Sequence, residues 1–321
     1  DISLKFRPPL VALVLSLVLG LLSGCSLFSA PLSTEQRTLE IEVRQTSAVD
    51  EVSYQRAPTS STLRLLSLNM AHGRKDSFSQ FLVSEAEIRQ NLGDIVEFLK
   101  RQNADVVTLQ EADAPSWWSG NFDHVELLAR EAGYSWYTHA NHVDNMFGTY
   151  GTAVLSRFPI TRGYRIDFNP TPPTTRKGFT LAEIEWSPGN RTDDHLTIDV
   201  LSVHLDFSRR SKRIEQIKDM KEVLGRRSNP AIVLGDFNST WTDGERQLQA
   251  LANSSGLTTH RPDANHLYTY FEERFDWILI AENFEFCDYY VASDTLSDHQ
   301  AVISEIVAID EEFELAACEV V

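Results

Sequence analysis

AIVLGDFN, residues 231–238, joins a run of apolar residues to a polar turn. An apolar run of this length that ends at a glycine predicts a strand buried on both faces. Asp236 and Asn238 follow the run, and residues placed at strand ends are held rigidly around a substrate. The stretch therefore predicts a buried sheet with a polar site at one edge.

The same order of an apolar strand and adjacent polar residues recurs along the chain. Strand patterns at 63–68, 106–109, 196–205, 275–280 and 300–307 all carry such residues at one end. These strand-end residues are Asn69, Glu111, His204, Asp276, Asp298 and His299. We expect them to converge on one edge of the fold.

Helix patterns separate some of these strands. Ser84 and Glu87 form a capping box, and apolar residues at 88, 92, 95 and 99 follow at helical spacing. A helix near 122–132 stops at Gly133, and another runs from 211 to 224. Further strands are expected at 134–139, 152–155 and 180–186.

Several of these strands have too little helix between them for a simple βαβ series. We therefore predict an α/β fold, a four-layer sandwich of two packed mixed β-sheets flanked by helices, rather than a Rossmann sheet or a TIM barrel. No Pro/Gly-rich break divides the region, so one domain is expected at 63–309, followed by an acidic tail at 310–321.

The N-terminal segment predicts a targeting signal. Lys5 and Arg7 precede an apolar run at 10–22 that is short for a bilayer span. Leu22-Ser23-Gly24-Cys25 resembles the bacterial lipobox, so we expect a signal peptide at 1–24 and lipidation of Cys25. A plain secretory signal and an uncleaved anchor helix are the alternatives.

The lipobox interpretation implies an extracytoplasmic, lipid-anchored protein of the bacterial cell envelope, at the outer membrane if the cell is Gram-negative, since Ser26 follows the cysteine. Residues 25–62 have the composition of a tether. Within them, the alternating stretch 39–44 fits either an edge strand or extended linker.

Composition narrows the class of protein. The 321 residues are 42% hydrophobic and 23% charged, as in ordinary globular proteins. The net charge is −17, and removal of Asp1, Lys5 and Arg7 with the signal makes it −18. An acidic body repels nucleic acid at long range, so a dedicated nuclease is possible but not favoured.

Two further features stay open. Cys287 and Cys318 either form a disulfide or remain two thiols. Between Arg209 and Arg227, eight basic residues stand against three acidic ones. This basic run either attracts an anionic headgroup or membrane, or is a solvated helix face.

The polar residues suit phosphoester chemistry, which needs a metal to neutralise phosphate oxygens and a positioned water. Mg²⁺ prefers oxygen ligands, which Glu111, Asn69 and Asp298 can supply, and Mn²⁺ is a possible substitute. A histidine beside a carboxylate is held in one orientation, as expected for His299 with Asp276.

The order of these segments resembles the endonuclease/exonuclease/phosphatase superfamily with the DNase I-like fold. The resemblance covers about 63–307. It rests on Leu68-Asn69, Gln110-Glu111, residues 151–159 (GTAVLSRFP), Val203-His204-Leu205, Gly235-Asp236-Phe237-Asn238, Asp276 and Ser297-Asp298-His299.

The resemblance implies a role for each position. Glu111 would be the main Mg²⁺ ligand, beside Asn69 and near Asp298. Asp236 would orient or deprotonate the attacking water, and Asn238 would bind phosphate. The remaining assignments are a carboxylate–histidine dyad of Asp276 and His299, a second active-site histidine at His204, and a phosphate-binding arginine at Arg176. His72, His139 and His142 are left out of the site as loop histidines.

The fold hosts several activities, so a resemblance cannot choose the substrate. We expect hydrolysis of a small or lipid phosphoester in the cell envelope, because of the lipid anchor and the acidic body. The alternatives are an extracytoplasmic nuclease cleaving DNA or RNA and a catalytically inactive binding module.

Overall fold

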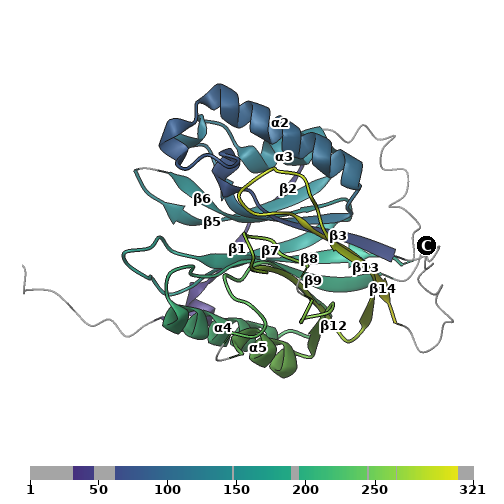
Figure 1. The fold of residues 1–321 in the computed structure, drawn as a ribbon. Coiled ribbons are helices and arrows are strands. Elements are labelled where there is room, and N and C mark those ends of the chain that lie inside the picture. The colour runs from purple at the N-terminus through teal and green to yellow at the C-terminus, as the bar shows by residue number, and fades with distance from the viewer. Residues whose placement is uncertain are drawn as a thin grey trace, which may run out of the picture. The chain divides into compact units, whose positions relative to one another are not determined.

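The computed structural model describes residues 32–46, 62–146, 148–188, 195–243, 246–264 and 266–309. Two seven-stranded sheets pack face to face in the unit that begins at Thr34 (Figure 1). The first sheet has the order β1 (Thr38–Ile41), β7 (Ile160–Asp167), β8 (Gly178–Trp186), β9 (Leu196–His204), β10 (Ala231–Asp236), β12 (Asp276–Ala281) and β11 (Leu257–Thr259). The second has the order β13 (Phe284–Val291), β14 (Val302–Ala308), β3 (Thr62–Asn69), β4 (Val106–Asp113), β6 (Thr149–Ser156), β5 (Trp136–Asp144) and β2 (Val43–Gln45).

Helices cover the outer face of each sheet (Figure 1). The second sheet carries α2 (Glu85–Gln102) and α3 (His124–Ala132), and the first carries α4 (Arg210–Leu224) and α5 (Gln247–Ser255). Both sheets are mixed, because β9 and β10 are parallel, as are β3 and β4, while the other pairs are antiparallel. The predicted four-layer α/β sandwich is confirmed. Short 3₁₀ turns are η1 (Glu35–Arg37), η2 (Ala71–Gly73), η3 (Gln80–Leu82) and η4 (Trp117–Ser119).

Two apolar clusters hold the layers together. One fills the space around the first sheet, both between the sheets and under α4 and α5. The other lies between the second sheet and α2 and α3. Near the site the space between the sheets turns polar: Gln110 Nε2 donates to Ser202 Oγ at 3.1 Å, and Ser202 Oγ donates to Leu109 O at 2.9 Å. Pairing of these buried polar groups ties the two sheets in register.

The predicted helices form where capping and periodicity placed them. Ser84 caps α2 in a complete capping box, and the four predicted apolar positions are buried. Gly133 ends α3 in the left-handed conformation, at φ 80°. In α4, Ile217 and Leu224 are buried, whereas Ile214 is only half-buried.

Several elements were not predicted, namely β7, β11, β13 and α5. The three strands among them alternate weakly between apolar and polar residues or are very short, so periodicity carries little signal there. Residues 39–44 form edge strands, which was one of the two alternatives. β1 pairs with β7 at the edge of the first sheet, and β2 pairs with β5 at the edge of the second. This part of the predicted 25–62 tether is therefore built into the sandwich.

Some predictions fall outside the described residues: the signal at 1–24, Cys25, the tail at 310–321 and Cys318. Cys287 is disulfide-bonded. Within the described ranges, no helix combines the length and apolar character that crossing a membrane requires.

Candidate functional site

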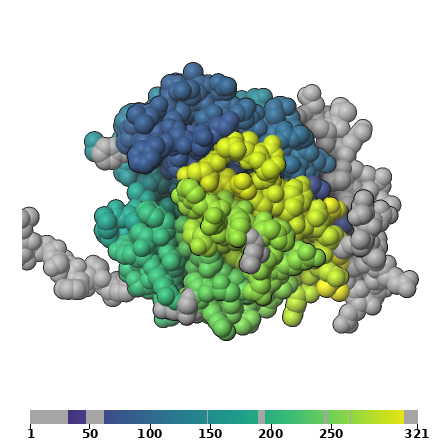
Figure 2. All heavy atoms as spheres, viewed as in Figure 1, coloured from purple at the N-terminus to yellow at the C-terminus, as the bar shows by residue number. Residues whose placement is uncertain are grey.

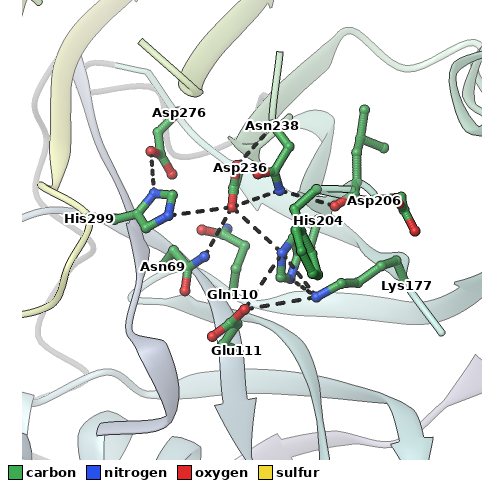
Figure 3. Close-up of polar contacts among 12 residues, drawn as sticks. Asn69, Gln110, Glu111, Lys177, His204, Asp206, Asp236, Asn238, Asp276 and His299 are labelled. Atoms are coloured by element: carbon green, nitrogen blue, oxygen red, sulfur yellow. Dashed lines mark hydrogen bonds and ion pairs between the residues drawn. The ribbon is translucent and has the colours of Figure 1, made fainter. Parts of the chain in front are cut away.

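Asp236 lies at the centre of the polar residues, at the carboxyl end of β10 (Figure 3). Its Oδ2 accepts hydrogen bonds from Asn69 Nδ2 at 3.0 Å and Asn238 Nδ2 at 3.1 Å. Gly235 precedes it with φ +142°, where an added Cβ would lie 2.1 Å from Val203 O. Only glycine allows β10 to approach β9 this closely. Burial and the neighbouring Asp276 raise the pKa of Asp236 to about 7, although His299 partly opposes this.

His299 forms a buried pair with Asp276. His299 Nδ1 lies 2.8 Å from Asp276 Oδ2, and its other ring nitrogen, Nε2, lies 3.8 Å from Asp236 Oδ2. Burial alone would lower the pKa of His299, but the two carboxylates outweigh it and raise the pKa to about 10. The imidazole is therefore favoured in its protonated form, with Nε2 turned toward Asp236 (Figure 3).

Glu111 reaches the site through an irregularity in β4. The register of β4 against β6 shifts between Gln110 and Ala112, and Glu111 sits at φ +50°. Such a bulge turns a side chain away from the regular alternation, and the unfavourable φ is typical of functional positions. Glu111 Oε1 thereby lies 3.8 Å from both Lys177 Nζ and His204 Nε2.

Histidine and lysine side chains surround the Glu111 carboxylate. Burial would raise its pKa, yet His72, Lys177 and His204 together hold the pKa well below the ordinary value. His72 Nε2 lies 3.3 Å from Glu111 Oε2, while His72 Nδ1 lies 2.9 Å from Asp113 Oδ2. Glu111 is therefore held as an ionised carboxylate among these basic side chains.

His204 and Lys177 form the side of the site opposite His299 (Figure 3). His204 Nε2 lies 3.6 Å from Asp236 Oδ2, and Lys177 Nζ lies 3.2 and 3.3 Å from the two ring nitrogens of His204. Burial, and then Lys177, lower the pKa of His204 well below its usual value. Burial also lowers the pKa of Lys177.

These side chains open onto a cavity of about 270 Å³. Its lining residues are Asn69, Arg74, Glu111, His204, Phe207, Asp236, Asn238, Tyr270, Phe275, Asp298 and His299. Arg74 Nη2 and Asp298 Oδ2 form an ion pair of 2.5 Å across the rim. In Figure 2, blue and yellow residues, which lie far apart in the sequence, abut on the face in view.

The structure brings together the predicted site residues Asn69, Glu111, His204, Asp236, Asn238, Asp276, Asp298 and His299. Arg176 does not join them. Its side chain is 43% exposed and its Nη1 lies 3.6 Å from Asp167 Oδ2. Neighbouring residues of an extended chain point to opposite sides, so Lys177 turns inward and Arg176 outward.

The sequence missed three contributors, namely Lys177, Arg74 and His72. Lys177 directly follows Arg176, the residue to which the resemblance assigns the phosphate-binding role. His72 was set aside as a loop histidine, whereas it is half-buried against Glu111. His139 and His142, also set aside as loop residues, lie within β5 instead.

The donor atoms fit a hard divalent cation. Glu111 and Asp298 line the same cavity as Asn69, and their side chains keep 21% and 29% exposure. Carboxylate and amide oxygens with room for water are the ligands that Mg²⁺ prefers. Within the described residues, Asp236, Asp276 and His299 also place ligand atoms within 4.8 Å of one another. The His299–Asp276 hydrogen bond accounts for that proximity.

A sequence model described as the endonuclease/exonuclease/phosphatase family matches residues 66–299. No match was found among curated proteins.

Three solved structures with the same fold illustrate the structural similarity. An endonuclease/exonuclease/phosphatase from Beutenbergia cavernae is 18% identical with a TM-score of 0.59, covering 77% of this chain and 72% of its own. A family protein from Bacteroides thetaiotaomicron is 20% identical, with a TM-score of 0.59 and coverage of 78% and 96%. Sphingomyelinase C from Streptomyces griseocarneus is 16% identical, with a TM-score of 0.54 and coverage of 76% and 98%.

Proposed function

Because the chain belongs to the endonuclease/exonuclease/phosphatase family, we propose that it hydrolyses a phosphoester bond with the help of a divalent cation. The observation that carries this proposal is the position of His299 Nε2. It lies 3.8 Å from Asp236 Oδ2 beside a cavity that Glu111 and Asn69 also line. An acid, a base and oxygen ligands thus surround one space that can hold a phosphate.

Glu111, Asn69 and Asp298 would hold the cation, Mg²⁺ or in its place Mn²⁺. When bound, it would neutralise phosphate oxygens and so favour attack by water. The histidine and lysine side chains around Glu111 keep the carboxylate ionised, and Arg74 is available to neutralise Asp298 when no cation is bound.

Asp236 would orient the attacking water and accept its proton. Asn69 and Asn238 fix the carboxylate from two directions, which holds one oxygen in a single orientation. A base works best when its pKa is near the working pH, and the pKa of Asp236 is raised to about 7.

His299 would donate from Nε2 to an oxygen of the phosphate. Asp276 fixes the ring through Nδ1 and favours the protonated form, so the donor is in place before the charge develops. On the opposite side Lys177 would supply a positive charge toward the remaining oxygens. The Asn238 amide lines the same cavity but donates to Asp236 Oδ2 and Leu205 O, so it would reach a phosphate oxygen only by giving up one of these bonds.

For the substrate, we propose a small or lipid phosphoester in the cell envelope, cleaved as a diester or monoester. The predicted lipid anchor at Cys25 and the net charge of −17 support it, and one similar structure is that of a sphingomyelinase C. An extracytoplasmic nuclease is the alternative and should lose activity steeply with salt. A catalytically inactive binding module would show no metal-dependent turnover.

The decisive assay uses the whole chain, because β1 and β2 lie upstream of residue 62 and belong to the sheets. Turnover of an artificial phosphodiester, phosphoinositides, sphingomyelin and plasmid DNA is measured with Mg²⁺ and with EDTA. We expect EDTA to abolish turnover and excess Mg²⁺ to restore it. Asp236→Ala should reduce the rate at least ~100-fold.

Two results would count against the proposal. Activity that is indifferent to EDTA would contradict the metal-assisted mechanism. Cleavage of DNA at physiological salt without turnover of any lipid would replace the proposed substrate with nucleic acid.

A further inference from the structure

Two groups of exposed apolar side chains are connected with the cavity by contacts of different length. The first group belongs to the first sheet: Phe207 follows β9 and lines the cavity, and Phe271 lies next to Tyr270, another lining residue. Phe207 is 63% exposed and Phe271 is 83% exposed. Tyr270 packs on His299 with ring centroids 4.6 Å apart, and Phe271 is the next residue in the chain.

The second group lies in segments that connect strands of the second sheet. It consists of Phe81, Trp117 and Met146, which are 65%, 58% and 78% exposed. The Phe81 ring lies 6.1 Å from that of Trp117, and Trp117 Nε1 donates to Met146 O at 2.9 Å. We call the two groups together the apolar rim.

The second group is linked to the site through two intervening residues, Trp118 and His72. The Phe81 ring lies 6.0 Å from that of Trp118, and the Trp118 ring lies 5.0 Å from His72. His72 in turn lies 3.3 Å from Glu111. The rim is therefore linked to Glu111 through Trp118 and His72, and it reaches the cavity lining itself at Phe207 and beside Tyr270.

Phe271 and the basic residues at the start of α4 occupy locally unfavourable positions, although Arg209 donates to Thr171 O and Arg213 to Asp206 O. Phe271 sits at φ +48° in the tight turn between Tyr270 and Glu273, where glycine or asparagine is favoured and a bulky residue is strained. The first turn of α4 holds no acidic residue and begins with Arg209, Arg210, Lys212 and Arg213, the reverse of what the helix dipole favours. An exposed aromatic residue and adjacent cations are thus placed beside the cavity mouth despite local cost.

We propose that the apolar rim docks on the surface of a phospholipid bilayer, with the cavity facing the headgroups. The inference rests on the proposed lipid phosphoester substrate and names how that substrate is reached. Apolar and aromatic side chains next to arginine and lysine are the composition of segments that lie in a membrane interface. A bilayer also presents the phosphate groups that the proposed site would bind, in its headgroup layer.

A nucleic acid fits this surface less well. Stacking on single-stranded bases would use the aromatic rings. Met146 and Leu82, the residue after Phe81 and 72% exposed, offer no aromatic face for such stacking. The net charge of −17 opposes a polyanion at long range. The local basic turn at Arg209–Arg213 attracts a headgroup without reversing that overall repulsion.

Trp117 gives a direct test of contact. All six tryptophans lie within the described residues, and Trp117 alone among them is exposed. The whole chain in EDTA is mixed with phosphatidylcholine vesicles whose acyl chains are brominated, with and without phosphatidylglycerol. We expect the vesicles to quench tryptophan fluorescence, and Trp117→Phe to remove most of that quenching. Equal quenching in the Trp117→Phe protein, or none in either protein, would overturn the proposal.

A second measurement separates docking from chemistry. Phe81→Ser and Phe271→Ser should each lower the rate on vesicle lipids about tenfold, since each removes a large apolar side chain from the bilayer. The rate on a soluble artificial diester should stay within twofold. Leu39→Ser is the matched control, because Leu39 is 49% exposed on β1 and lies outside the rim.

The outcomes distinguish the two proposals. Quenching at Trp117 without any lipid turnover would refute the proposed lipid substrate and leave the docking surface standing. Lipid turnover that is unaffected by both serine variants would refute the docking surface and leave the activity standing. Quenching of Trp117 by single-stranded DNA instead of vesicles would point to the nuclease.

Discussion

Two buried histidine–aspartate pairs of the same length lie in different parts of the sandwich. His299 Nδ1 is 2.8 Å from Asp276 Oδ2, and His142 Nδ1 is 2.8 Å from Asp167 Oδ1. The pairs differ at the other ring nitrogen. His142 Nε2 bonds to Thr152 Oγ1 at 2.9 Å, whereas His299 Nε2 faces Asp236 at 3.8 Å beside the cavity.

The consequence is an opposite preference for the proton. Burial lowers the pKa of His142 despite its bond to Asp167, whereas the pKa of His299 is raised to about 10 because two carboxylates outweigh burial. A histidine–aspartate pair is therefore not a catalytic signature by itself. The group that meets the second nitrogen decides whether the pair ties strands together or acts on a substrate.

Removing each imidazole ring should separate the two pairs most clearly. His299→Ala should lower kcat/KM at least ~100-fold, because it removes a positioned cationic donor. His142→Ala should change kcat/KM less than about threefold, yet lower the free energy of unfolding by about 2 kcal/mol, since it leaves buried polar partners unpaired. Steady-state kinetics and denaturant unfolding on both variants check the pair. Equal losses of activity would show that His142 belongs to the site.

The residues at strand ends were predictable because their signal is local. Asn69, Asp236 and His204 each directly end an apolar run, and the ends of neighbouring strands meet at one sheet edge. What the sequence could not supply was the orientation of residues in loops. His72 joins the site through positive φ values at residues 71 and 72, which no periodicity reports. The rim residues were missed similarly, because exposure in loops follows from tertiary structure.

For the adjacent residues Arg176 and Lys177, the sequence likewise does not show which side chain points into the site. Both are basic, and the choice between them depends on the register that pairs Gly178 with His204. An added Cβ at Gly178 would lie 2.4 Å from His142 Nδ1, so glycine permits the close packing of β8 here. That packing fixes Lys177 inward beside His204 and leaves Arg176 to Asp167.

Lys177 and Arg176 should also differ in how much their charge contributes to kcat/KM. Lys177→Met keeps the aliphatic stem and removes the charge 3.8 Å from Glu111, so kcat/KM should fall about tenfold. Arg176→Met, the matched control, should leave kcat/KM within twofold. Kinetics on a soluble phosphodiester test both. A larger loss in the Arg176 variant would restore the phosphate-binding arginine that the sequence predicted.

The smallest expected effect is a contrast in how stability depends on pH. A raised pKa favours the protonated form in the fold, so the contribution of His299 is complete below pH ~6.5 and is lost as the pH rises toward 10. A lowered pKa does the opposite, so the contribution of His142 is complete above ~6.5 and is lost as the pH falls. One proton per molecule sets the limiting slope at about 1.4 kcal/mol per pH unit.

Unfolding of the wild type, His142→Ala and His299→Ala proteins in EDTA at several pH values measures both contributions. The stability lost in His299→Ala should shrink from pH 7 to pH 10, and the stability lost in His142→Ala should shrink from pH 7 to pH 5. If both losses followed pH in the same direction, the second ring nitrogen would not be what separates the two pairs. The distinction between a structural and a catalytic histidine would then have to come from access to the cavity alone.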